Sequence, residues 1–112
     1  MSTLIENLEA LLQRGSDTAL LRFSLGSAYF GRGDFELAVS HLQRAVELDG
    51  TYSAAWKMLG RAQAAGGDAA AAMASYHRGI AVADARGDQQ AAREMRVFLR
   101  RLGRAAGAGT DC

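Results

Sequence analysis

Two histidines and one glycine-rich segment are the residues whose types could carry chemistry in this chain. His41 and His77 could bind a metal ion, but they stand at non-equivalent places in a repeated pattern, and no cysteine or close acid completes a ligand set with either. The segment Gly31–Asp34 reads Gly-Arg-Gly-Asp, yet it lacks the preceding strand and the Gly-Lys-Ser/Thr ending of a phosphate-binding loop. We therefore expect no enzyme activity, no metal and no cofactor.

The single cysteine and the single tryptophan have structural interpretations. Cys112 is the only cysteine, so no intrachain disulfide can form, and we interpret it as an inert thiol rather than a redox or attachment site. Trp56 is expected to pack between helices rather than to hold a ligand. No apolar run approaches the roughly 18 residues that a membrane span needs, and residues 1–4 lack the basic start of a signal peptide. These observations predict no membrane span and favour the cytoplasm.

Charge is balanced over the whole chain but not along it. The 13 Lys and Arg against 12 Asp and Glu leave a net charge of +1, which by itself indicates neither a nucleic-acid nor a membrane partner. Residues 1–52 carry four arginines and seven acids, a net charge of −3, whereas residues 53–112 carry nine Lys and Arg and five acids, a net charge of +4. This asymmetry favours head-to-tail contact between copies, so self-assembly stays open as a function.

The elements that must position any site follow from an internal repeat. Of the chain, 49% is apolar, mostly Ala and Leu, with no proline and few Thr and Ile, which favours helices over strands. A shift of 34 brings seven residues onto identical ones: Leu25/Leu59, Gly26/Gly60, Ala28/Ala62, Gly33/Gly67, Asp34/Asp68, Ala38/Ala72 and Arg44/Arg78. Gly26 and Gly60 would let two helices approach closely. The Gly-Asp pair suits a helix-to-helix turn, because glycine adopts a positive φ and aspartate caps the next helix.

This pattern resembles the tetratricopeptide repeat, a helix–turn–helix unit of the same period with the signature W-x2-L-G-x2-Y, then A-x3-F, then Pro. The first repeat carries, in that order, Arg22, Leu25, Gly26, Tyr29, Ala38, Leu42 and Ala45. The second carries Trp56, Leu59, Gly60, Gln63, Ala72, Tyr76 and Gly79. Neither has the closing proline, which Gly50 and Asp84 replace. The resemblance covers residues 19–86 and implies an all-α fold, a short right-handed α-solenoid of antiparallel helices.

On this frame the chain forms one domain over residues 1–106 with about six helices. The expected parts are an N-terminal capping helix at 3–14, repeat 1 at 19–52, repeat 2 at 53–86, a C-terminal capping helix at 88–105 and a disordered tail at 107–112. Thr3 and Glu6 form a capping box at the start of the first helix. Asp17 is expected to cap the first helix of repeat 1. The second helix of repeat 2 is expected to end at Ala83, followed by a turn one residue longer than the frame requires.

The resemblance also implies a concave groove, lined by the first helix of each repeat, that binds peptides. The groove positions carried over onto this chain are Phe23, Ser27 and Phe30 in repeat 1, Lys57, Met58 and Arg61 in repeat 2, and Arg93, Arg96 and Arg100 in the C-terminal helix. Some family members hold a peptide's terminal carboxylate with Lys and Asn. Phe23, Ser27 and Met58 stand at three of those places, so we do not expect chaperone-tail binding.

What remains is a groove with an apolar end and a basic end. Phe23 and Phe30 form the apolar end, while Lys57, Arg61 and the three arginines of the last helix form the basic end, with Glu94 expected to point elsewhere. We therefore predict a protein–protein interaction module that binds an acidic peptide segment. Two alternatives stay open: the arginines are only the solvated face of an amphipathic helix, or the protein is a self-assembling structural subunit. RNA binding is less favoured, because the last helix has one aromatic residue, on the face opposite its arginines.

Overall fold

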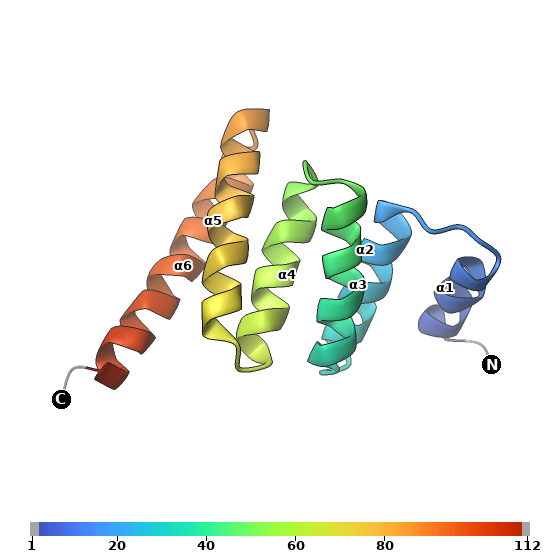
Figure 1. Ribbon diagram of the computed structural model, residues 1–112, viewed down its shortest axis with the longest axis horizontal. Coiled ribbons are helices and arrows are strands. Elements are labelled where there is room, and N and C mark those ends of the chain that lie inside the picture. The colour runs from blue at the N-terminus through green and yellow to red at the C-terminus, as the bar shows by residue number, and fades with distance from the viewer. Residues whose placement is uncertain (1–2, 111–112) are drawn as a thin grey trace.

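The computed structural model describes residues 3–110, and the side chains of residues 3–105, as six α-helices without a strand. The helices are α1 (Leu4–Gln13), α2 (Ala19–Gly31), α3 (Phe35–Leu48), α4 (Ser53–Ala65), α5 (Ala69–Arg86) and α6 (Gln89–Thr110). They follow one another along the long axis of the molecule, with α1 at one end and α6 at the other (Figure 1). The all-α helical-repeat fold predicted from the sequence is confirmed.

Three of the described helices begin at the cap that the sequence predicts. The Thr3 hydroxyl accepts from the Glu6 amide at 3.1 Å, and the Asp68 carboxylate accepts from the Ala71 amide at 3.1 Å. Asp34 plays the same part for α3. Each cap satisfies a backbone N–H that has no partner inside the helix.

The expected cap at Asp17 is wrong. Thr18 directly precedes α2, and its hydroxyl accepts from the Leu21 amide at 3.1 Å. Asp17 is thereby free to accept two hydrogen bonds from the Arg22 guanidinium, at 2.7 and 3.2 Å. A bidentate charge-assisted pair of this kind is stronger than a single hydrogen bond between neutral groups. Asp17 therefore pairs with Arg22, and Thr18 caps the helix.

Close approach of helices depends on three glycines. A Cβ on Gly26 would overlap the Leu42 side chain of α3, and a Cβ on Gly60 would overlap the Tyr76 ring of α5. On Gly79 a Cβ would lie 2.5 Å from the Met95 Sδ of α6 and 2.8 Å from the Trp56 Cβ of α4. The predicted roles of Gly26 and Gly60 as contact points between helices are confirmed.

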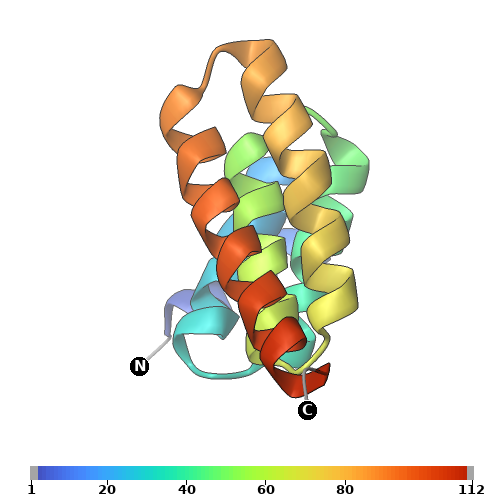
Figure 2. The same ribbon diagram turned by 90° about the vertical axis from the view of Figure 1, so that its left-hand side faces the viewer.

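The helices form two layers. Helix α4 lies against both α2 and α6, whereas in the described part of the chain no Cα atoms of α3 and α5 come within 8 Å of each other. We call the surface formed by α2, α4 and α6 the inner face, and that of α3 and α5 the outer face. Figure 2, seen from the α6 end, shows α6 lying beside α5. One buried cluster lies among α3 and α4, and a second joins α5 to α6 through Tyr76, Ala83, Ala92 and Met95.

Helix α5 is longer than the sequence analysis expected. It begins in phase with α3 on the repeat frame, but it has 18 residues where α3 has 14, and it ends at Arg86 rather than Ala83. Helix α3 stops at Asp49, whose carboxylate accepts from the Thr51 amide at 3.0 Å, whereas α5 continues through helix-favouring residues until Gly87 turns left-handed at φ 78°. Although the turn after α5 is shorter, α6 begins at Gln89, two positions later than the repeat frame would place it.

The C-terminal helix is also longer than expected. Residues 107–110, assigned to a disordered tail, continue α6 to Thr110. The alanines around them are the strongest helix formers, and no proline interrupts the run, so the backbone hydrogen bonds can continue. Asp111 and Cys112 lie outside the described residues.

Candidate functional site

The position of α6 decides which arginines reach the inner face. Leu25, Leu59 and Met95 are each the seventh residue of their helix, and each has a side chain that is 0% exposed. The frame of α6 is therefore displaced by two residues, and the one-residue displacement expected from the sequence is wrong. The cause is the extra turn of α5, which continues to Arg86 and ends where Gly87 adopts a left-handed conformation.

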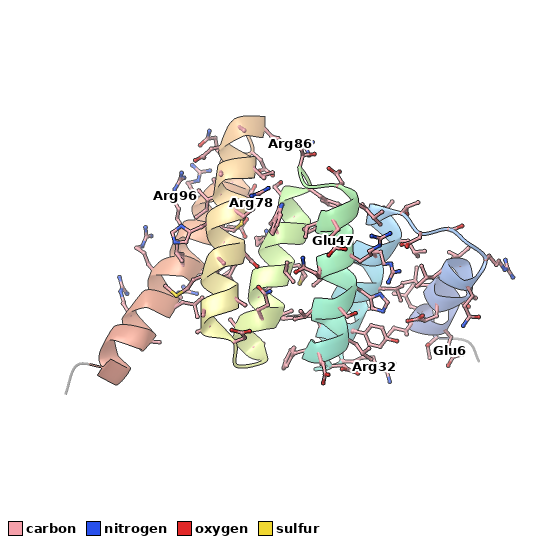
Figure 3. All side chains as sticks on the ribbon, viewed as in Figure 1. Glu6, Arg32, Glu47, Arg78, Arg86 and Arg96 are labelled. Atoms are coloured by element: carbon pink, nitrogen blue, oxygen red, sulfur yellow. The ribbon has the colours of Figure 1, made fainter. Side chains whose placement is uncertain are left out.

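Arg96 leaves the inner face in this frame. Arg96 is the eighth residue of α6. The eighth residues of α2 and α4 are Gly26 and Gly60, which contact α3 and α5 rather than the inner face. The Arg96 Nη2 lies 2.5 Å from the Asp84 carboxylate of α5, and Figure 3 shows Arg96 on the side away from α4. Of the nine residues predicted for the groove, Arg96 is the one that the structure places elsewhere.

Arg93 and Arg100 stay on the inner face, although each stands one place earlier in the frame than predicted. Arg93 is the fifth residue of α6, the place held by Phe23 in α2 and Lys57 in α4. Arg100 is the twelfth residue, the place held by Phe30 in α2. Both side chains are exposed, and neither forms an ion pair with another described residue. They are free to meet charges on another molecule.

Lys57 has an unexpected partner. Its Nζ lies 3.4 Å from both carboxylate oxygens of Glu94, which was expected to point elsewhere. The two-residue displacement explains the error, because it moves Glu94 to the sixth place of α6, which Met58 holds in α4. The ion pair joins α4 to α6 and neutralises one of the predicted cations.

Arg61 is held between two aromatic rings from neighbouring helices. Its guanidinium carbon lies 5.0 Å from the centroid of Phe30 in α2 and 5.8 Å from that of Phe98 in α6. Rings at this distance attract a cation through their electron-rich faces. Arg61 is exposed and has no ion-pair partner among the described residues, so its N–H groups are available to a ligand. The contact between Arg61 of α4 and Phe98 of α6 was not predicted.

The apolar residues of the inner face are half-buried rather than free. Phe23, Phe30 and Met58 pack against the core cluster of α3 and α4. The Phe23 ring lies 5.0 Å from the Tyr52 ring, and the Phe30 ring lies 5.5 Å from the Phe35 ring. The Ser27 hydroxyl between them has no hydrogen-bond partner in the described part of the chain. These contacts hold the apolar side chains of the inner face against the core.

A polar cluster that sequence reasoning missed joins α1 to α2 and α3. The His41 side chain is buried, stacks on the Tyr29 ring at 5.5 Å, and accepts at Nδ1 from an Arg22 N–H at 3.1 Å. Its Nε2 lies 3.5 Å from the Glu9 carboxylate of α1, which also accepts from the Tyr29 hydroxyl at 3.0 Å. The clue in the sequence was Arg22, which stands where the family pattern has tryptophan.

Titration within this cluster is altered by its surroundings. Burial lowers the pKa of His41 below 6.5, although the Glu9 carboxylate acts in the opposite direction. The hydrogen bonds from Arg22 hold the pKa of Asp17 below its usual value. Burial and the bond to Glu9 raise the pKa of Tyr29. The cluster therefore holds a neutral histidine between an arginine and a carboxylate, which is a structural arrangement.

The remaining candidate residues do not form a catalytic or metal site in the described part of the chain. His77 is exposed on α5, and Trp56 packs between helices, donating its ring N–H to the Gly50 carbonyl at 2.9 Å. Among residues 3–110, no three His, Cys, Asp or Glu side chains are placed to hold a metal ion. No helix in the same range is both long and apolar enough to cross a bilayer.

Comparison with known proteins places this geometry in a family. The sequence model of the tetratricopeptide repeat matches residues 5–53 and 23–91. The TPR repeat-containing protein PA0015 of Pseudomonas aeruginosa is 54% identical over 102 residues, which cover 91% of this chain and 97% of the relative.

Solved structures agree with this match. The solution structure of protein BPP2914 from Bordetella parapertussis superimposes with a TM-score of 0.84 at 45% identity, covering 96% of this chain and 94% of the other. The first TPR of Spaghetti (RPAP3), bound to the HSP90 peptide SRMEEVD, has a TM-score of 0.68 at 22% identity, covering 93% and 90%, a likeness of fold alone. The matches support a role as a protein–protein interaction module and show that the chain belongs to the tetratricopeptide repeat family.

Proposed function

We propose that the inner face binds an acidic peptide segment of a partner protein. The observation that carries the proposal is Arg61, an exposed guanidinium held between Phe30 and Phe98 with no carboxylate partner among the described residues. An arginine held in place loses little freedom when it binds, and its planar N–H groups match a carboxylate with two hydrogen bonds. Arg61 would thus be the anchor for an Asp or Glu side chain.

The surrounding residues suit the same ligand. Arg93 and Arg100 add two unpaired cations along α6, which would attract and orient a negatively charged segment. Lys57 can contribute only by exchanging its contact with Glu94. The half-buried rings of Phe23 and Phe30, with Met58, offer a firm surface for an apolar side chain beside the acid. The proposed site therefore consists of one anchor, two steering charges and one apolar contact area.

A protein of similar fold binds an acidic peptide, but its ligand cannot be transferred to this chain. The Spaghetti domain was solved with the peptide SRMEEVD, which is acidic. Here Phe23, Ser27 and Met58 stand where carboxylate-binding members of the family have Lys and Asn, so we propose a different acidic segment. We keep the cytoplasm as the proposed compartment, because the single cysteine cannot form an intrachain disulfide.

The test is a titration of the full chain with the probe peptide acetyl-Glu-Leu-Glu-Glu-amide, followed by NMR. Arg61→Gln should weaken binding about tenfold, the equivalent of one charge-assisted hydrogen bond of about 1.4 kcal/mol. Arg96→Gln is the matched control, because it also removes one positive charge but lies off the inner face. Equal weakening by both variants would reduce the effect to net charge and contradict the anchor. Binding should also weaken as salt rises above about 0.15 M.

The alternative is self-assembly, which exposed leucines at the N-terminal end favour. Leu4 is 65% exposed and Leu11 is 42% exposed on α1. Together with the opposite net charges of the two halves, they would support head-to-tail contact between copies. Light scattering at two protein concentrations distinguishes the functions, because a mass that rises with concentration indicates assembly.

A further inference from the structure

The outer face carries a notch that the proposed function does not use. It lies where the start of α3 faces the end of α4 and the start of α5, and it encloses about 360 Å³. Among its lining residues, Phe35 and Val39 are half-buried and apolar, Ala62 is fully buried behind the surface, and Glu36 and Asp68 are exposed at the edge. The volume lies near the lower end of the range for small-ligand pockets, about 300–1,000 Å³, which suits one large side chain.

The notch exists because two packing contacts are missing. No Cα atoms of α3 and α5 lie within 8 Å of each other, so the two helices leave a gap beside the end of α4. Gly66 has no side chain, so the space beside Phe35 stays open. A Cβ at this position would occupy that space, 3.5 Å from the Phe35 Cβ. The backbone of Gly66 has φ −81° and ψ 1°, a conformation open to any residue. Backbone geometry therefore does not require glycine at this place, in contrast to Gly67, whose φ is 92°.

The edge of the notch is negatively charged. Glu36 and Asp68 form no ion pair with any described residue, and neither does Asp34, which caps the same helix that carries Glu36. One oxygen of Asp68 accepts from the Ala71 amide, which leaves the other oxygen available. An apolar lining beside an uncompensated acidic edge is complementary to an apolar side chain with a basic neighbour.

We propose that this outer notch docks a partner segment in which a leucine-like side chain stands beside Lys or Arg. The apolar side chain packs on Phe35 and Val39, and the cation lies against Glu36 and Asp68. This surface is separate from the inner face and selects the opposite charge. One copy of the chain can then hold an acidic segment on one side and a basic segment on the other.

The experiment titrates the full chain with acetyl-Ser-Lys-Leu-Arg-Ser-amide and follows the methyl signals of Val39 and Ala62 by NMR. The double variant Glu36→Gln with Asp68→Asn should weaken binding about tenfold, the effect of losing two exposed charge contacts. Asparagine caps a helix as well as aspartate does, so α5 keeps its start. Glu47→Gln is the control, because it removes a carboxylate of α3 that lies outside the notch (Figure 3). Glu47 pairs with Arg44 instead.

A second variant tests the cavity itself. Gly66→Leu fills the wall of the notch in an allowed backbone conformation, and it should abolish binding while the helical spectrum is unchanged. The proposal is overturned if millimolar peptide leaves Val39 and Ala62 unshifted, if it shifts Met58 instead, or if either variant binds as the parent does. Arg61→Gln should leave this titration unchanged, so failure here and failure of the proposed inner-face site are distinguishable.

Discussion

The two ends of the solenoid are held by different chemistry. At the N-terminal end, Ile5 is the one buried residue of α1, and Glu9 adds polar contacts to Tyr29 and His41. At the C-terminal end, Ala91, Ala92 and Met95 of α6 are buried against Tyr76 and Ala83 of α5. Apolar burial scales with area and does not depend on pH, whereas a polar attachment depends on the protonation of its members. We therefore expect the attachment of α6 to be independent of pH and the attachment of α1 to weaken with acid.

Removing each terminal helix should give the largest contrast. Truncation after Arg86 exposes Tyr76, Gly79 and Ala83, which are buried, so the remaining chain should aggregate or lose helical signal. A chain that begins at Ser16 loses one buried residue, Ile5, and the polar contacts of Glu9, so it should stay folded with a lower Tm. Circular dichroism and light scattering of both truncated forms measure the difference. A monomeric C-terminal truncation with an unchanged spectrum would contradict the capping role of α6.

A single core substitution should show the same contrast on a smaller scale. Met95 is 0% exposed and packs against Gly79, so Met95→Ala leaves a cavity and should cost about 2–5 kcal/mol of unfolding free energy. Leu11→Ala on α1 is the control, because its side chain is 42% exposed. Urea unfolding of the two variants gives the comparison, and similar losses would show that the two ends are equally firm.

Overpacking tests the interior between the ends. Gly60→Leu forces a side chain into the Tyr76 ring and should cost about 1–3 kcal/mol, although leucine is the better helix former. Gly103 has no neighbouring atom within 4 Å, so Gly103→Leu should be neutral or stabilising. Thermal unfolding distinguishes the two substitutions. A raised Tm for Gly60→Leu would contradict the close contact between α4 and α5.

Acid should weaken the N-terminal end by the smallest amount. The folded-state pKa of His41 is lowered by burial, so the unfolded chain binds the proton more readily as pH falls below 6.5. Stability is thus complete above that pH and declines from 6.5 down to the folded pKa. The groups facing His41 are Glu9, Arg22, Asp17 and Tyr29.

Unfolding free energies measured between neutral pH and about pH 5 check this effect. His41→Gln should flatten the decline, whereas His77→Gln, at an exposed position, should keep it. Hydrogen exchange of α1 should rise over the same pH range. An unchanged slope in His41→Gln would assign the decline to other groups.

Much of the fold was predictable because its signals are local. Helix limits followed from the Gly-Asp turns, since the φ of Gly33 is 77° and that of Gly67 is 92°, and aspartate caps the helix that follows each. The contacts of Gly26 and Gly60 followed from the internal repeat, because a close helix crossing tolerates no side chain. The repeat places six of the nine predicted binding residues, those in α2 and α4, at the expected inner-face positions. Arg93 and Arg100 stay on that face one place earlier than expected, and Arg96 leaves it.

The sequence alone determined the helical repeat, the caps at Thr3, Asp34 and Asp68, the close contacts and the family, because each depends on residues a few places apart or on the repeat itself. The tertiary structure decided where α6 sits, since the extra turn of α5 moves it by two residues. That displacement pairs Lys57 with Glu94 and Arg96 with Asp84, and it sets Phe98 beside Arg61. Which charges are free on a helical face depends on the neighbouring helices, and their positions emerge only when the chain is packed.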